Sequence, residues 1–189
     1  PANVVIGGAA GYSNDILISG NCNQCFGNVS SITVNTKGDY TATGTTLTLG
    51  HDQSFQVNAA GNVSTGTVIG GQSVGFTGGG VISVDGAITL PNGNLQLSGT
   101  GFDISAPVNV GGGTVSLLPI GSTTINGEQL SNITAGGLNI GNGQAAQNVT
   151  LTGNTDLSNI SGQVNVNLGG NFDSSQASVQ VGNASMIVN

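Results

Sequence analysis

Two cysteines near the start of the sequence have a spacing that can support chemistry. Cys22 and Cys25 lie in "GNCNQCFGN" as a Cys-x-x-Cys pair. A zinc site needs four ligands, and the chain has two cysteines and one histidine in all. A thioredoxin-type centre places the pair at the start of a helix in a βαβ unit, which the pattern here does not predict. We therefore predict a local disulfide between Cys22 and Cys25 that holds a glycine-rich turn in an oxidising compartment.

The acidic residues are the other candidates for chemistry. They are Asp15, Asp39, Asp52, Asp85, Asp103, Glu128, Asp156 and Asp173. Enzymes that cleave polysaccharides use paired carboxylates, and calcium sites use clusters of oxygen ligands. These acids are scattered, and the only basic residue apart from His51 is Lys37. We predict no enzyme, no metal and no cofactor, although folding could still bring two acids together on adjacent turns.

His51 and Asp52 are neighbours and invite comparison with a catalytic pair. Successive side chains on a strand point to opposite faces, and no serine stands out as a nucleophile. We therefore interpret His51 as an exposed turn residue.

The charge of the chain limits its partners. Charged residues make up 5% of the 189 residues, and the formal net charge is -7. With one lysine and no arginine, the chain cannot neutralise phosphates, which argues against nucleic acid and anionic membrane surfaces. No apolar run reaches the ~18 residues of a spanning helix. No leader segment is recognisable and the sequence begins at Pro1, so we interpret it as a mature or excised segment.

Short alternating stretches recur along the whole sequence. Examples are "SITVNT" from Ser31, "SVGFT" from Ser73, "LQLSG" from Leu95 and "TVSLL" from Thr114. Each alternates apolar and polar residues and is bounded by Gly, Asn, Asp or Pro, which is typical of strands. Helical periodicity is close to absent. The sequence predicts an all-β protein.

The spacing and composition favour a solenoid over a sandwich. Several steps between strands that end in glycine are near twenty residues. Abundant Gly and Asn with few charges suit strands stacked directly on one another, because stacked like charges repel. We predict one right-handed parallel β-helix over residues 1–189, with irregular turns of about twenty residues, or a fragment of a longer rod. A pilin-like β-sandwich is the alternative.

The stretch "LSNITAGGLNIGNG", followed by "NVTLTGNTDLSNISGQVNVNLGG", resembles the β-helical repeats of filamentous-haemagglutinin-like exoproteins. The resemblance is strongest from about Gly121 to Gly170. It implies a bacterial surface adhesin exported by two-partner secretion, and hence a secreted, extracellular or cell-surface location. The secretion domain of that family carries Asn-Pro-Asn motifs, whereas "LPNGN" (Leu90 to Asn94) lacks the first Asn. This chain is therefore not assigned as that domain.

Neither end shows an amphipathic helix that would cover it. The apolar strand patterns at the ends predict open edges that another chain can extend. These predicted assembly edges are Val4, Val5, Ile6, Met186, Ile187 and Val188. We expect a structural rod or filament that supports adhesion or matrix. Its partners are further copies joined end to end or neighbouring segments of a longer chain, with a host or matrix glycan or protein as a further partner. The alternatives are a pilin-like subunit joined by strand donation and a glycan-binding or polysaccharide-cleaving β-helix.

Overall fold

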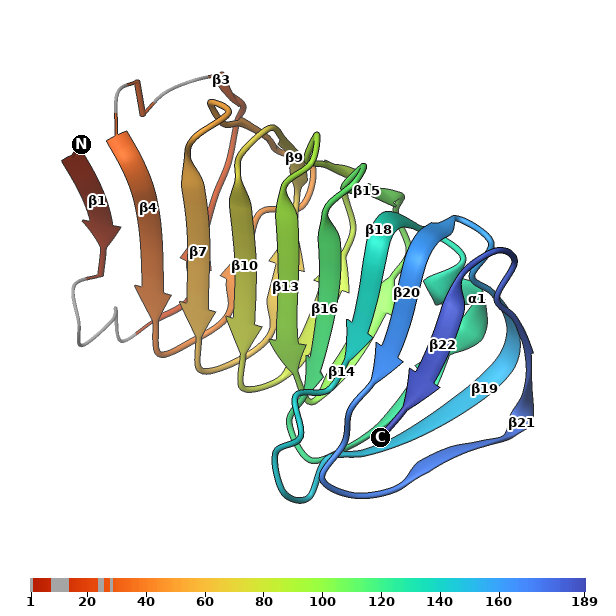
Figure 1. Ribbon diagram of the computed structural model, residues 1–189. Coiled ribbons are helices and arrows are strands. Elements are labelled where there is room, and N and C mark those ends of the chain that lie inside the picture. The colour runs from red at the N-terminus through yellow and green to blue at the C-terminus, as the bar shows by residue number, and fades with distance from the viewer. Residues whose placement is uncertain (1, 8–13, 24–25, 28) are drawn as a thin grey trace.

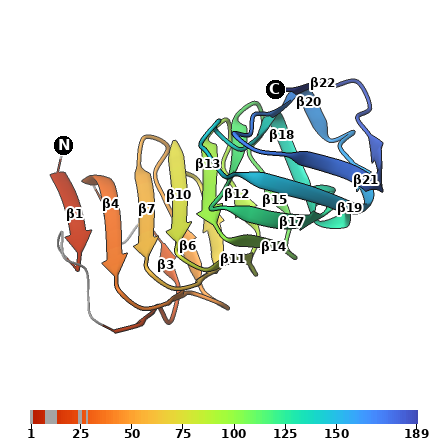
Figure 2. The ribbon, with the colours of Figure 1, turned by 90° about the horizontal axis from the view of Figure 1, so that it is seen from below.

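The computed structural model describes residues 2–7, 14–23, 26–27 and 29–189. It confirms the predicted fold: parallel strands stack into a right-handed β-helix of about seven turns (Figures 1 and 2). The sandwich alternative is wrong, because consecutive turns pair side by side in parallel and the described chain does not form two packed antiparallel sheets.

Three faces run along the solenoid. The first face consists of β1 (Ala2–Ile6), β4 (Val29–Thr36), β7 (Ser54–Ala59), β10 (Ser73–Gly78), β13 (Asn94–Gly99), β16 (Thr114–Pro119), β18 (Ile133–Ile140), β20 (Ile160–Val166) and β22 (Ser185–Val188). The second face begins with β2 (Ile16–Leu17), β5 (Tyr40–Thr41), β8 (Val63–Thr65), β11 (Val81–Val84) and β14 (Gly101–Ile104). It continues in a separate sheet formed by β17 (Ser122–Asn126), β19 (Asn148–Asp156) and β21 (Phe172–Gln180).

The third face closes each turn. It consists of β3 (Cys22–Asn23), β6 (Thr46–Thr48), β9 (Thr67–Ile69), β12 (Ile88–Thr89), β15 (Val108–Asn109) and the first residues of β18. One short helix in the described chain, α1 (Gly127–Leu130), lies between β17 and β18. The side chain of Asn126 caps it by accepting a hydrogen bond from the Glu128 N–H.

The pairing register gives the length of each turn. Ser31 pairs with Ser54, a step of 23 residues, and Ser54 pairs with Ser73, a step of 19. The longest later step is 26 residues, from Gly137 to Gln163. The turns are therefore irregular and close to the predicted twenty residues.

Alternate residues of each strand point inward and form the core. On the first face Val57, Phe76, Leu97 and Leu117 follow one another in consecutive turns, and each is at most 1% exposed. Phe55 and Phe76 pack edge to face with ring centroids 5.9 Å apart. This core consists of apolar ladders stacked along the axis, so each turn depends on contacts with its two neighbours.

Candidate functional surface

The structure brings Asp15 and Asp39 to the same corner of consecutive turns, between the first and second faces. Asp15 Oδ1 accepts a hydrogen bond from the Asp39 N–H at 2.8 Å. Asp39 Oδ1 accepts from the Asn62 N–H at 2.6 Å, and Asn62 Oδ1 accepts from the Val81 N–H at 2.9 Å. Each side-chain oxygen therefore holds the backbone of the next turn. We call this arrangement of Asp15, Asp39 and Asn62 the Asx corner.

A glycine lies above each oxygen of the Asx corner. These glycines are Gly38, Gly61 and Gly80, and a Cβ added to any of them would overlap the oxygen of the turn below, well inside 3.0 Å. The series ends where Val81 replaces the Asx residue, and the next turn carries Thr100 in place of glycine, with its N–H bonded to the Gly80 carbonyl. The signal available in the sequence was the Gly-Asx dipeptide repeated as Gly38-Asp39 and Gly61-Asn62. Our sequence analysis missed it.

The other described acids also contact nearby donors. Asp85 accepts hydrogen bonds from the hydroxyls of Ser64 and Thr43, which lie in the two preceding turns. Asp103 Oδ1 accepts from Gln129 Nε2 of α1 at 2.8 Å. Among the residues that the structure describes, no group of three or more His, Cys, Asp and Glu side chains is placed to hold a metal ion.

Two acids near the C-terminal end have perturbed ionisation. The backbone N–H of Ser158 lowers the pKa of Asp156, and that of Ser175 lowers the pKa of Asp173. Each bond spans two residues, to Oδ1 at 2.9 Å, and closes a local turn. Both carboxyls are fully exposed, so their shifted pKa values describe turn geometry.

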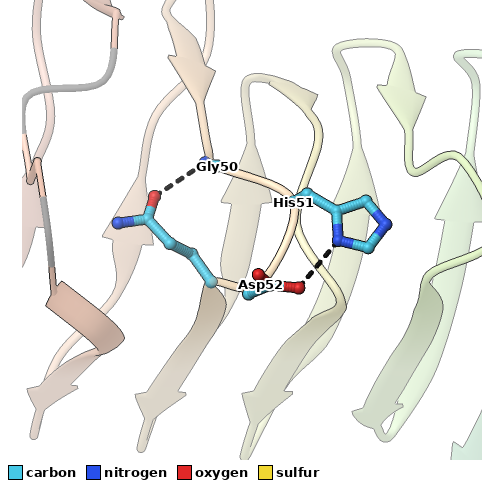
Figure 3. A network of polar contacts seen from close by, with 4 residues as sticks. Gly50, His51 and Asp52 are labelled. Atoms are coloured by element: carbon cyan, nitrogen blue, oxygen red, sulfur yellow. Dashed lines mark hydrogen bonds and ion pairs between the residues drawn. The ribbon is translucent and has the colours of Figure 1, made fainter. Parts of the chain in front are cut away.

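His51 and Asp52 lie on the turn between β6 and β7 (Figure 3). His51 Nδ1 is 2.7 Å from Asp52 Oδ1, and the two side chains are 84% and 91% exposed. The interpretation of His51 as an exposed turn residue is confirmed. The two side chains reach each other because they occupy a turn, where the alternation of a strand does not apply. The same turn is closed from inside by Gln53, whose Oε1 accepts from the Gly50 N–H at 2.7 Å.

The two cysteines differ in how the structure describes them. Cys22 lies in β3, opposite Leu47 of β6, in the inward ladder of the third face. Cys25 lies outside the described residues, so the predicted Cys22–Cys25 disulfide stays a prediction. The position of Cys22 in a strand corrects the expectation that it belongs to a turn.

Tyr40 is a buried titratable group at the same end of the solenoid. It is 4% exposed and lines an apolar cavity of about 90 Å³, together with Ile6, Ile18 and Cys22. Desolvation by burial raises the pKa of Tyr40 to about 12. The neutral phenol is therefore favoured in the folded state.

This pKa shift predicts a loss of stability in alkali. The contribution of Tyr40 is complete below pH 10, the value for an unfolded tyrosine, and is lost as the pH rises toward 12. We expect the free energy of unfolding to fall by about 2 kcal/mol over this interval, measured by denaturant titration. Tyr40→Phe should remove that fall, whereas Tyr12→Phe should keep it. An equal fall in both variants would contradict the assignment to Tyr40.

The outer side of the first face carries a row of polar, uncharged residues. The central outward position of successive strands is occupied by Val5, Thr33, Gln56, Gly75, Gln96, Ser116, Asn139, Asn165 and Ile187. Some of the amides in adjacent rows are linked, as where Asn58 Nδ2 donates to Asn35 Oδ1 at 2.8 Å. We call this row the outer ladder. Its seven central positions are glycine or residues with hydroxyl or amide groups.

The predicted assembly edges lie at the two ends of the first face. Val5 is 56% exposed, Ile187 43% and Val188 52%, while Val4, Ile6 and Met186 are half-buried. Within the described chain, β1 pairs with β4 alone and β22 with β20 alone. These strands therefore present one free edge each, and their use in assembly stays a prediction.

Comparison with known proteins found no matching family model, no similar curated protein and no similar solved structure. In the described part of the chain, no helix has the length and apolar character needed to cross a membrane.

Proposed function

We propose that this protein is a structural rod of a bacterial surface or extracellular matrix, which supports adhesion and does not catalyse a reaction. One observation carries the proposal: the first face is continuous along the whole solenoid, has an uncharged polar outer ladder and ends in free strand edges. The resemblance of residues 121–170 to filamentous-haemagglutinin-like repeats supports the secreted or cell-surface location and the adhesive role.

The placement of the acids supports a structural role. At the Asx corner, Asp15 and Asp39 each use an oxygen to hold the next turn. Asp85 and Asp103 likewise bind side chains from other turns. Such contacts strengthen the interfaces between turns on which a solenoid depends. The Cys22–Cys25 disulfide, proposed for an oxidising compartment, would serve the same purpose at the N-terminal turn.

The composition of the surface supports two kinds of partner. We propose that further copies of the chain, or flanking segments of a longer one, extend the free edges by strand addition. A host or matrix glycan is the second candidate, because the hydroxyls and amides of the outer ladder can donate and accept hydrogen bonds. The single lysine argues against nucleic acid.

End-to-end assembly can be tested with substitutions on the outer ladder. We expect the purified chain to form longer particles as its concentration rises, measured by sedimentation velocity and negative-stain electron microscopy. Val5→Lys should abolish this growth, because a charge on an edge strand opposes strand addition. Thr33→Lys is the matched control, since it adds the same charge one turn further in, and growth should persist.

A chain that stays monomeric at every concentration would contradict end-to-end assembly of this segment. Growth of Val5→Lys equal to that of the unmodified chain would show that another surface mediates association. Antibody labelling of intact source cells checks the proposed location.

A further inference from the structure

The three faces of the solenoid have unequal numbers of strands. In the described chain the first face has nine strands, from β1 to β22, and the second face has eight, from β2 to β21. If β1 of a second copy paired with β22, the two first faces would join. The second faces would then lie one strand spacing, about 4.8 Å, too far apart. If β1 paired with β20 in place of β22, all three faces would continue without a gap.

The sequences of β1 and β22 fit this exchange. On β4, β1 aligns Val4, Val5 and Ile6 with Ile32, Thr33 and Val34. On β20, β22 aligns Met186, Ile187 and Val188 with Val164, Asn165 and Val166. Both strands therefore present aliphatic, aliphatic, aliphatic in the same register. Among the nine strands of the first face, these two alone have an aliphatic residue on the outer ladder.

The half-buried parts of the core also lie at the two ends. At the N-terminal end they include Ile16, Ile18 and Phe26, and at the C-terminal end Phe172, Val179 and Val181. Pairing of β1 with β20 brings the second and third faces of the two copies into contact, where these side chains can be buried. Apolar burial then favours the junction in addition to the strand pairing.

We propose that β22 is an internal cap on β20, and that it occupies the place which β1 of a second copy takes when two solenoids join head to tail. This rests on the end-to-end assembly proposed above and specifies its register. β22 is suited to exchange, because it has one neighbouring strand in the described chain and because Ile187 and Val188 are about half exposed. A heterologous contact of this kind extends into an open filament.

A reversible lock tests the exchange in the full chain. Asn165→Cys with Ile187→Cys places two cysteines opposite each other on adjacent strands, at a spacing of about 4.8 Å that a disulfide can bridge. We expect the oxidised variant to stay monomeric in sedimentation velocity and a reducing agent to restore association. Gln96→Cys with Ser116→Cys is the matched control, because it locks two strands in the middle of the same ladder and should leave association unchanged.

A second variant should have the opposite effect. Ile187→Pro removes an N–H on the side of β22 that faces β20, where the Asn189 N–H already donates to the Val166 carbonyl at 2.9 Å. If β22 is undocked for about a tenth of the time, removal of this competition lowers the midpoint concentration of association about tenfold. A synthetic peptide with the sequence of residues 185–189 should raise it again.

The outcomes separate this inference from the proposed function. If the oxidised lock associates as well as the unlocked chain and Ile187→Pro does not associate, β1 adds to β22 and the exchange is wrong, while end-to-end assembly stands. If the unmodified chain, the reduced lock variant and Ile187→Pro all stay monomeric, both the exchange and end-to-end assembly are wrong. If the mid-ladder control also becomes monomeric on oxidation, the loss is due to rigidity of the rod and the exchange is again wrong.

Discussion

Leu97→Ala is expected to lower the free energy of unfolding by about 3–4 kcal/mol. Leu97 is fully buried in the inward ladder of the first face, between Phe76 of the preceding turn and Leu117 of the next. Truncation leaves a cavity that faces both neighbours, and the stacked backbones cannot close it without breaking their strand pairing. Denaturant titration followed by circular dichroism measures the loss.

Gln96→Ala is the matched control for this prediction. Gln96 is the preceding residue on β13 and points outward on the outer ladder, where it is exposed. Its truncation should change the free energy of unfolding by less than about 0.5 kcal/mol. Comparable losses in Gln96→Ala and Leu97→Ala would show that the register of β13 differs by one residue from the one described.

Gly61→Ala is the second substitution with a large expected effect, a loss of about 3 kcal/mol. Its Cβ would overlap Asp39 Oδ1, which also accepts the Asn62 N–H. The methyl group therefore displaces the carboxylate and breaks the hydrogen bond that holds the next turn. Gly101→Ala is the matched control, because its Cβ would have an ordinary contact of 3.5 Å with Val81. We expect that substitution to be nearly neutral.

A double-mutant cycle identifies the cause of the Gly61 effect. Asp39→Ala removes the oxygen that the new methyl group would meet, and alone it should cost about 1 kcal/mol for the lost hydrogen bond. If overlap with Asp39 is the cause, Gly61→Ala should cost much less in the Asp39→Ala background than in the unmodified chain. Additive losses would place the strain elsewhere, for example against the Gly38 backbone.

The fold could be predicted because its signals are local. "LQLSG" from Leu95 predicts a strand by its alternation and its terminal glycine, and it lies within β13. Abundant Gly and Asn with one basic side chain apart from His51 favoured stacked turns over a sandwich. Both signals are read from neighbouring residues and from composition, so neither requires knowledge of which turns meet.

The Asx corner could not be predicted in the same way, because it depends on register. Asp15 and Asp39 are 24 residues apart, and Asp39 and Asn62 are 23 apart. Other steps in the solenoid range from 19 to 26 residues. With steps this unequal, the residue above a given aspartate cannot be counted from the sequence. The scattered acids therefore looked unconnected, although the fold places two of them in one column.

The Asx corner also determines how such a rod can change its length during evolution. A turn that contains a Gly-Asx pair can lie directly above a copy of itself, because the glycine leaves room for the oxygen below and the Asx oxygen holds the turn above. Duplication of the segment from Asp39 to Gly61 therefore adds a turn without steric conflict at this corner. Insertion of the turn that carries Thr100 directly above Asp39 or Asn62 would instead place a Cβ against the oxygen. Growth by duplication is thus open to the N-terminal turns, and the order of the turns at this corner is fixed by the atoms in contact.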